Sequence, residues 1–369
     1  YEANLKYFEF DNDNSEMATE AANGLLLSNH SYGTASGWRL IKSSCGCSVI
    51  NTPGCFVDNT AWKWYGNQCI STTEDYTFGL YSQASAAWDT IAYNAPYYLI
   101  INAAGNDRGE GSTSMICGYL HTPSSGSQTC VSSCTPFPRP FPLDGSQNGG
   151  YDCINPHGVA KNILTVGAVG DIPAGYSNPG DIILWSLSSW GPTDDGRIKP
   201  DIVANGTCIR STWPGSQIPG CCGVCAGSYS ALSGTSSACA SVTGSLALLQ
   251  QHHSNTHDST FMFAATLKAL LIHTADEAGT ANGPDYKHGW GLLNTKKAAD
   301  IITRDVTSCA KPIHELVLNQ NDTFQLNFDY DTSQLFIKAT IVWNDPAGTP
   351  VAAALDTPVL MLVNDLDLR

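Results

Sequence analysis

The sequence predicts an α/β fold in which a mainly parallel sheet carries helices on both faces. Short apolar runs of strand length alternate along residues 1–307 with longer segments whose apolar residues recur at helical spacing. The pattern changes from about residue 308, because residues 324–328 and 335–343 alternate between apolar and polar positions. Such alternation is typical of antiparallel strands with one buried face, so we expect residues 308–369 to begin a second, β-rich domain.

The first part of the chain supplies two predicted helices and one strand. Residues 1–24 have a helix-forming composition that ends at a glycine, and residues 25–28 form a short apolar run that predicts a buried strand. A cysteine-rich insertion covers residues 38–76. Apolar residues then recur every three or four positions in residues 80–94, which predicts a helix.

The middle of the chain continues the alternation. Residues 97–104, 163–169 and 201–204 predict three more strands, and two further cysteine-rich insertions cover residues 108–151 and 208–230. All three insertions leave the carboxyl ends of apolar strands. Ligands of open α/β sheets bind outside those strand ends, so we expect the insertions to wall a cleft.

The stretch Ser233-Gly-Thr-Ser-Ser-Ala238 predicts a tight turn that delivers a serine to the start of a helix, which continues through residues 239–251. Gly234 permits the turn, and Thr235 or Ser236 is expected to cap the helix. The helix has little polar surface, which predicts that it is buried all round. Residues 263–274 and 294–303 predict two further helices.

A serine in this turn lies at the positive end of the helix dipole, beside unpaired backbone N–H groups. This position favours the generation and stabilisation of an oxyanion. The alternative interpretation is a capped core helix without chemistry.

The overall composition excludes several classes of function. The 369 residues include 18 Lys and Arg against 33 Asp and Glu, for a net charge of −15, which argues against a nucleic-acid partner. This balance suits an acidic extracellular protein and permits calcium binding. No run of 18 or more apolar residues occurs, so no membrane span is predicted.

Fourteen cysteines are many for a chain of this length, and twelve of them fall in three groups of four, each in a stretch rich in Gly, Ser and Pro. Even numbers of cysteines in loop-like segments indicate disulfides and an oxidising compartment, either extracellular or the lumen of the secretory pathway. The disulfide candidates are Cys45, Cys47, Cys55, Cys69, Cys117, Cys130, Cys134, Cys153, Cys208, Cys221, Cys222 and Cys225.

The cysteine and asparagine patterns also suit a zinc site, free thiols and N-glycosylation. The spacing of Cys222 and Cys225 suits zinc, but no second such pair lies at finger spacing, so no metal site is assigned. Cys239 and Cys309 stand outside the groups, and Cys239 is expected to be a small buried thiol. Asn205 and Asn321 open sequons that are candidates for N-glycosylation in a secreted protein.

Several stretches together resemble the subtilase (subtilisin-like) serine peptidases, over roughly residues 1–305. Ser233-Gly-Thr-Ser-Ser-Ala238 resembles the nucleophile motif, and Ile101-Asn-Ala-Ala-Gly-Asn106 resembles the strand that carries the oxyanion asparagine. Asn29-His-Ser-Tyr-Gly33 resembles the substrate-binding strand. Residues 188–201 and 289–294 are similar to family-typical flanking segments. The resemblance implies a parallel α/β sheet and hydrolysis of peptide bonds in a protein or peptide substrate.

The resemblance also implies a role for each matching residue. Ser236 would be the nucleophile, and Asn106 would hold the developing oxyanion together with the backbone N–H of Ser236. Ser31, Tyr32 and Gly33 would pair with the substrate backbone as an added strand. Ala103, Ala104 and Gly105 are small enough to leave room for a substrate side chain.

Four histidines were candidates for a catalytic base or a metal site, and neither role is assigned to them. In the family the position of His30 is not the catalytic base, and a structural role is expected for it. His252, His253 and His257 have metal-like spacing but follow the buried helix, where a polar surface is expected.

The sequence departs from the family where the aspartate and histidine of the triad should be. It contains no Asp-Ser-Gly, Asp-Thr-Gly or His-Gly-Thr motif, and Ala240 replaces the usual proline after the serine. Without a base, Ser236 is a weak nucleophile. We therefore expect residues 1–307 to be a catalytic domain without its Asp/His segment, completed by an upstream part of a longer precursor.

Two main hypotheses follow. The chain is either part of an active secreted endopeptidase, or a subtilase-derived structural or binding protein in which catalysis has been lost. A lipase-type hydrolase is a distant third, because its Gly-x-Ser-x-Gly elbow is absent.

The C-terminal segment, residues 308–369, resembles the β-sandwich that follows some subtilase domains, so a partial antiparallel β-sandwich is expected there. Its pieces Trp343-Asn-Asp-Pro346 and Val363-Asn-Asp-Leu-Asp367 carry carboxylates that suit either a structural calcium ion or ordinary turns. No cofactor is required for the chemistry itself.

Overall fold

The computed structural model describes residues 3–42, 60–67, 69–71, 73–108, 119–121, 129–131, 151–212, 229–309, 311–327 and 337–368. Side chains are described for these residues except at positions 40–42, 60–63, 119–121 and 129–131.

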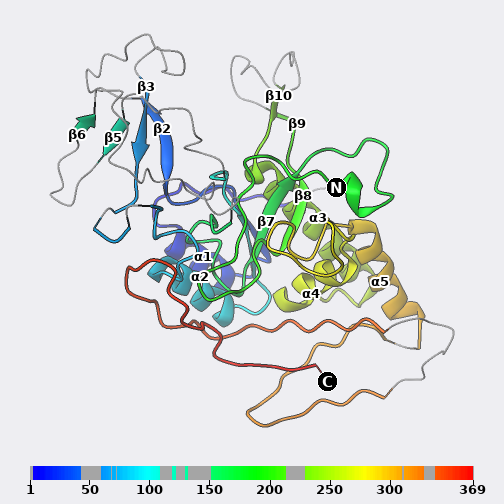
Figure 1. Ribbon diagram of the computed structural model, residues 1–369. Helices are drawn as coiled ribbons and strands as arrows, with labels where there is room; N and C mark the ends of the chain where they lie inside the picture. Colours follow the sequence, from blue (N-terminus) through cyan, green and yellow to red (C-terminus); the bar gives the residue numbers. More distant parts are fainter. Residues whose placement is uncertain are drawn as a thin grey trace.

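The centre of the molecule is a four-stranded parallel sheet in the order β1-β4-β7-β8 (Figure 1). Its strands are β1 (Leu27–His30), β4 (Leu99–Ala103), β7 (Leu164–Val169) and β8 (Ile202–Asn205). Every residue of β4 and β7 is buried. These strands are almost wholly apolar because they are covered on both faces, which confirms the predicted parallel sheet.

Helices cover the two faces of this sheet. Leu99 and Ile101 of β4 belong to the core that includes residues of α3 (Thr235–Thr256), α4 (Ala264–Thr274) and α5 (Thr295–Thr307). Tyr98 and Ile100 belong to the opposite core, under α1 (Asp13–Ala22) and α2 (Gln83–Asn94). Because successive side chains of a strand point to opposite faces, β4 feeds both cores at once.

The predicted N-terminal helix is shorter than expected. Residues 3–10 are not helical, and the helix begins only after Asn12, which has a left-handed backbone with φ of 70°. Leu5 and Tyr7 are about nine-tenths exposed, so no packing favours a helix there. The other predicted helices are present, and α2 begins with a capping box between Ser82 and Ser85.

The insertions build two accessory sheets. The first and second insertions together form a sheet in the order β2-β3-β5-β6, from β2 (Trp38–Lys42), β3 (Thr60–Trp64), β5 (Tyr119–His121) and β6 (Thr129–Val131). In Figure 1 this sheet stands apart from the main body, at the upper left. The third insertion is bracketed by β9 (Ile209–Thr212) and β10 (Tyr229–Leu232), which pair as antiparallel strands ahead of α3.

The C-terminal segment follows the surface of the catalytic core. Residues 311–327 and 337–368 contain no strand among the described residues, so the β-sandwich stays a prediction. The segment is nevertheless anchored, because Asp345 forms a buried ion pair with Lys161. Lys161 Nζ also donates to the carbonyls of Pro346 and Met361, at 2.6 and 2.8 Å. Met361 is buried in a cluster that includes Tyr81 and Ala104.

The structure corrects two of the disulfide assignments. Cys69 and Cys153 are thiols, as are Cys239 and Cys309. Cys153 is completely buried beside Trp190, whose backbone N–H donates to the sulfur at 3.4 Å. Burial raises the pKa of this thiol to about 12. Cys69 is exposed in a short turn, where its N–H donates to Asn67. Packing rather than cross-linking explains Cys153, which the loop-like spacing alone could not reveal.

The structure describes only part of the remaining ten disulfide candidates. Cys208 is disulfide-bonded. The side chain of Cys130 on β6 is not described, and eight candidates lie outside the described residues, namely Cys45, Cys47, Cys55, Cys117, Cys134, Cys221, Cys222 and Cys225.

Candidate active site

Ser236 occupies the first turn of α3, as the sequence predicted. The helix is capped by Gly234, which has no side chain to contribute, so the expected cap from Thr235 or Ser236 is wrong. The N–H of Gly234 donates to Gly206 at 2.8 Å, and a side chain at Gly206 would lie 2.7 Å from the Gly234 carbonyl. The serine turn therefore packs closely on the end of β8.

Asn106 is oriented by Thr235, a residue that sequence reasoning did not assign a catalytic role. Asn106 Oδ1 accepts hydrogen bonds from the Thr235 N–H at 3.0 Å and the Thr235 hydroxyl at 2.8 Å. Two donors on the oxygen fix the amide, so its Nδ2 donors are left for another acceptor. The backbone N–H of Ser236 has no hydrogen-bond partner within the described part of the chain. The roles of these two donors in an oxyanion hole stay a prediction.

Residues 31–33, the stretch expected to bind substrate, follow β1 and begin directly beside Ser236. Ser236 Oγ donates to the Ser31 carbonyl at 3.1 Å, and Ser31 Oγ donates to the Ser236 carbonyl at 2.9 Å. Tyr32 is half-buried and Gly33 is exposed. The Tyr32 hydroxyl donates to Asp13 at 2.9 Å, which ties this stretch to α1.

The small residues after β4 lie in different surroundings. The methyl groups of Ala103 and Ala104 are buried in two separate core clusters, whereas Gly105 is half-buried. Gly105 has φ of +116°, and a side chain there would lie 2.7 Å from Asp107 Oδ2. Only glycine fits this turn, which leads directly into Asn106.

No histidine reaches Ser236 Oγ by a hydrogen bond within the described part of the chain. The ring of His30 is bound between Ser28 and the Tyr32 hydroxyl, at 2.7 and 2.6 Å, and burial lowers its pKa to about 4. His30 is therefore a neutral structural residue, as expected.

The other histidines that were considered lie near the far end of α3 from Ser236. The rings of His253 and His257 stack at 4.0 Å, and His257 contacts Asp305 at 3.3 Å. His252 contacts the Thr303 hydroxyl at 2.8 Å. These contacts hold α3 against α5 and the loop that follows α3.

An ion pair lies immediately behind the oxyanion asparagine, and sequence reasoning missed it. Arg39 of β2 contacts Asp107 at 2.6 Å, and the Asp107 side chain is only 2% exposed. Burial raises the pKa of Asp107 to about 6, although the Arg39 charge opposes this shift. No local pattern in the sequence relates positions 39 and 107.

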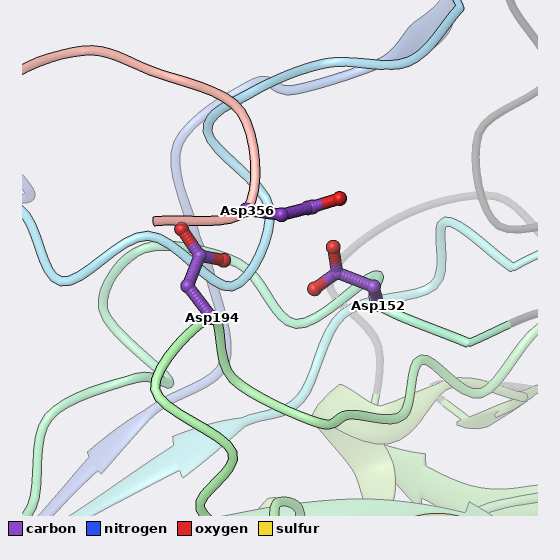
Figure 2. Close-up of side chains that lie close together, drawn as sticks. All are labelled: Asp152, Asp194 and Asp356. Atoms are coloured by element: carbon purple, nitrogen blue, oxygen red, sulfur yellow. The ribbon is translucent and has the colours of Figure 1, made fainter. Parts of the chain in front are cut away.

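Three carboxylates, those of Asp152, Asp194 and Asp356, converge on one another (Figure 2). Their nearest oxygens lie within 4.8 Å, and among the described residues this is the group that could hold a metal ion. One buried oxygen each of Asp152 and Asp194 has no hydrogen-bond partner within that part of the chain. Burial, with the neighbouring carboxylates, raises the pKa of Asp152 to about 9 and of Asp194 to about 7.

One of the C-terminal carboxylates that suggested calcium, Asp345, is engaged by protein groups. Asp345 accepts from the N–H groups of Val363 and Asn364, at 2.9 and 2.8 Å, in addition to its ion pair with Lys161. Its oxygens are therefore satisfied by protein donors.

The glycosylation candidates differ in their surroundings. The Asn205 amide donates to Asp171 at 3.0 Å and its oxygen accepts from the Thr207 N–H. Asn321 is exposed, in a turn where its φ is 69°.

A parallel α/β sheet with helices on both faces places a helix-start serine next to Thr235, which orients Asn106. A model of the subtilase family matches residues 8–291, and the chain therefore belongs to this family of serine proteases. No described helix is long and apolar enough to cross a membrane.

Two curated relatives share only part of their length with this chain. It is 32% identical over 202 residues to the serine protease/ABC transporter B family protein tagA of Dictyostelium discoideum, which covers 49% of this chain and 11% of that protein. It is 31% identical over 184 residues to C5a peptidase of Streptococcus pyogenes serotype M6, which covers 46% of this chain and 14% of the peptidase. The chain thus spans a small fraction of these relatives.

A solved structure with a related arrangement is the patellamide maturation protease PatA. It matches with a TM-score of 0.43 and 16% identity, over 79% of this chain and 68% of PatA.

Proposed function

We propose that the chain is the nucleophile-bearing part of a secreted subtilisin-like endopeptidase, completed by an upstream segment that supplies the aspartate and histidine. The observation that carries this proposal is the geometry around Ser236: an oriented Asn106, a hydrogen-bonded substrate strand and no base within the described residues. Residues 1–307 would form the catalytic domain and residues 308–369 would begin the β-sandwich domain.

In this mechanism the chain binds an extended protein or peptide substrate along residues 31–33. Ser236 Oγ attacks the scissile carbonyl while the upstream histidine takes its proton. Asn106 and the Ser236 N–H stabilise the oxyanion, for which removal of one such donor costs about 10²–10³ in kcat, a figure measured on subtilisin itself. The amine leaves with the proton, and water hydrolyses the acyl-enzyme.

A contiguous apolar surface supports the docking of such a segment. The sequence predicted that α3 is buried all round, but Ala240, Gly244, Ala247 and Leu248 are exposed on one face. Ser236 lies on the same face, four residues before Ala240. Beside this face, β1 is an edge strand of the central sheet, and Thr243 of α3 contacts Asn29 of β1 at 3.2 Å.

These two features suit one occupant, a strand with a neighbouring helix. A strand can extend the sheet at β1, where its carboxyl end would approach Ser236, and a helix can cover the small residues of α3. A structural calcium ion would be held by Asp152, Asp194 and Asp356, since two of their buried oxygens have no described partner and oxygen ligands suit calcium. The chemistry itself needs no cofactor.

Secretion is supported by the disulfide-bonded Cys208 and the exposed sequon at Asn321. The competing proposal is a binding protein in which Ser236 is a relic.

A fluorophosphonate probe separates the two proposals. We expect Ser236 to be labelled when the chain is expressed together with the segment that precedes it, and to be unlabelled when Ser236 is replaced by Ala. An intact, folded precursor that resists labelling would overturn the peptidase and favour the binding protein.

Substitution Gly244→Gln tests the docking surface directly. Nothing lies within 4 Å of a side chain at Gly244, and glycine costs a helix interior about 1 kcal/mol, so the chain alone should be at least as stable. We expect the variant to lose labelling of Ser236, because the larger side chain blocks the upstream segment. Lys296→Gln, on the exposed surface of α5, is the matched control and should be labelled normally.

A further inference from the structure

The residue that follows the oxyanion asparagine is anchored from outside the catalytic core. The N–H of Asp107 donates to Ser189 Oγ at 3.1 Å, and its carboxylate packs against Gly105. Arg39 Nη2 lies 2.6 Å from Asp107 Oδ1. The Asp107 backbone is therefore bound to Ser189, and the Asp107 carboxylate lies between Gly105 and the Arg39 guanidinium, although neither carboxylate oxygen has a hydrogen-bond partner among the described residues.

The backbone around Arg39 is held by contacts within the first insertion. Trp38, next to Arg39 at the start of β2, is completely buried and packs on Trp64 of β3, with ring centroids 5.1 Å apart. The N–H of Gly37 donates to Asp75 at 2.7 Å, and its carbonyl accepts from Tyr65 at 2.9 Å. These contacts fix the position of Arg39 at the start of β2.

Charge complementarity explains why the contact matters. A buried carboxylate without a counter-charge takes up a proton or moves toward water. The positive charge of Arg39 opposes protonation of Asp107, whereas the negative charge of Asp75 raises the pKa of Asp107 further. Loss of the guanidinium would release the Asp107 side chain, and with it the turn that carries Asn106.

We propose that Arg39 is a positioning residue for the oxyanion hole, through which the cysteine-rich accessory sheet sets the placement of Asn106. The inference rests on the proposed peptidase function. It gives a role to the charged residue that the first insertion places against Asp107.

The test uses the complete precursor, with Arg39→Met, Arg39→Lys and Asp107→Asn. Because the oxyanion forms only in the transition state, we expect Arg39→Met to lower kcat by about tenfold with KM within about twofold. The affinity of a peptide boronate, which forms a tetrahedral adduct, should fall by the same factor as kcat. Arg39→Lys should restore part of the loss.

Arg197→Met is the matched control, because Arg197 forms a similarly buried pair with Asp195 at 2.7 Å in a different turn. It should lower the melting temperature without changing kcat per folded molecule. Were Arg39→Met to fold poorly, Asp107→Asn would replace it, because this variant also removes the ion pair. Its kcat would then be compared with that of the wild type and of Arg39→Lys.

Two results would overturn the inference while leaving the peptidase intact: an unchanged kcat in Arg39→Met, or a loss that follows only the folded fraction. An inactive wild-type precursor would instead overturn the proposed function, so the two failures are distinguishable.

Discussion

Asp201 and the group of Asp152, Asp194 and Asp356 are carboxylates in contrasting surroundings: Asp201 is buried, whereas Asp152 and Asp194 are half-buried and Asp356 is exposed. Asp201, at the start of β8, contacts Lys199 at 2.7 Å and Lys268 at 2.8 Å and accepts from the Thr165 N–H. The group of Asp152, Asp194 and Asp356 gathers three carboxylates, and no ion pair is recorded to any of them within the described residues.

The protonation behaviour follows from this difference. Burial alone would raise the pKa of Asp201, but the two lysines hold it below its usual value. The pKa of Asp152 rises to about 9 because burial and the neighbouring carboxylates act in the same direction. One site is complete within the chain, and the other requires a proton or a cation.

The largest effect is expected where the complete site is broken. Asp201→Asn leaves Lys199 and Lys268 buried without their counter-ion, which should lower the free energy of unfolding by about 3–5 kcal/mol. Urea denaturation measures the change. A loss below about 1 kcal/mol would mean that the lysines are not held by Asp201 and that the contrast between the two sites is false.

The incomplete site should respond in the opposite sense. A carboxyl whose folded pKa is raised stabilises the fold below its unfolded pKa, and this contribution is lost as pH rises toward the folded value, here about 9. Asp152→Asn removes the group that titrates. The free energy of unfolding of this variant should therefore exceed that of the wild type by more at pH 8 than at pH 5, by up to about 4 kcal/mol.

Adding calcium to the wild type and to Asp152→Asn tests whether this group of carboxylates binds the ion. If a cation balances the carboxylates, millimolar calcium should stabilise the wild type at pH 8 and leave Asp152→Asn nearly unchanged. An equal response of both proteins would exclude the cluster as the calcium site.

The smallest effect is expected at an exposed pair. Lys296 and Asp300 contact at 2.6 Å on α5 with side chains 84% and 61% exposed. Lys296→Ala should change the free energy of unfolding by less than about 0.5 kcal/mol, because solvent screens such pairs. A larger loss would show that contact distance, rather than burial, separates strong from weak ion pairs in this protein.

The sequence predicted the parallel sheet, most helices and the turn of Ser236, because these depend on local periodicity and glycine. It could not predict the exposed face of α3, since Ala240 and Gly244 suit a buried helix equally well. It also could not predict the pairing of Arg39 with Asp107, or the thiol state of Cys153. These depend on which segments meet in space, and no local period encodes that.

The anchoring of Asp345 has a consequence for how the chain folds. Lys161 lies three residues before β7, and its ammonium group is enclosed by C-terminal oxygens from Asp345, Pro346 and Met361. Without that segment, the Lys161 ammonium group would lose these three oxygen partners. These contacts join the segment after residue 308 to the core, so we expect unfolding of either part to be cooperative with the other.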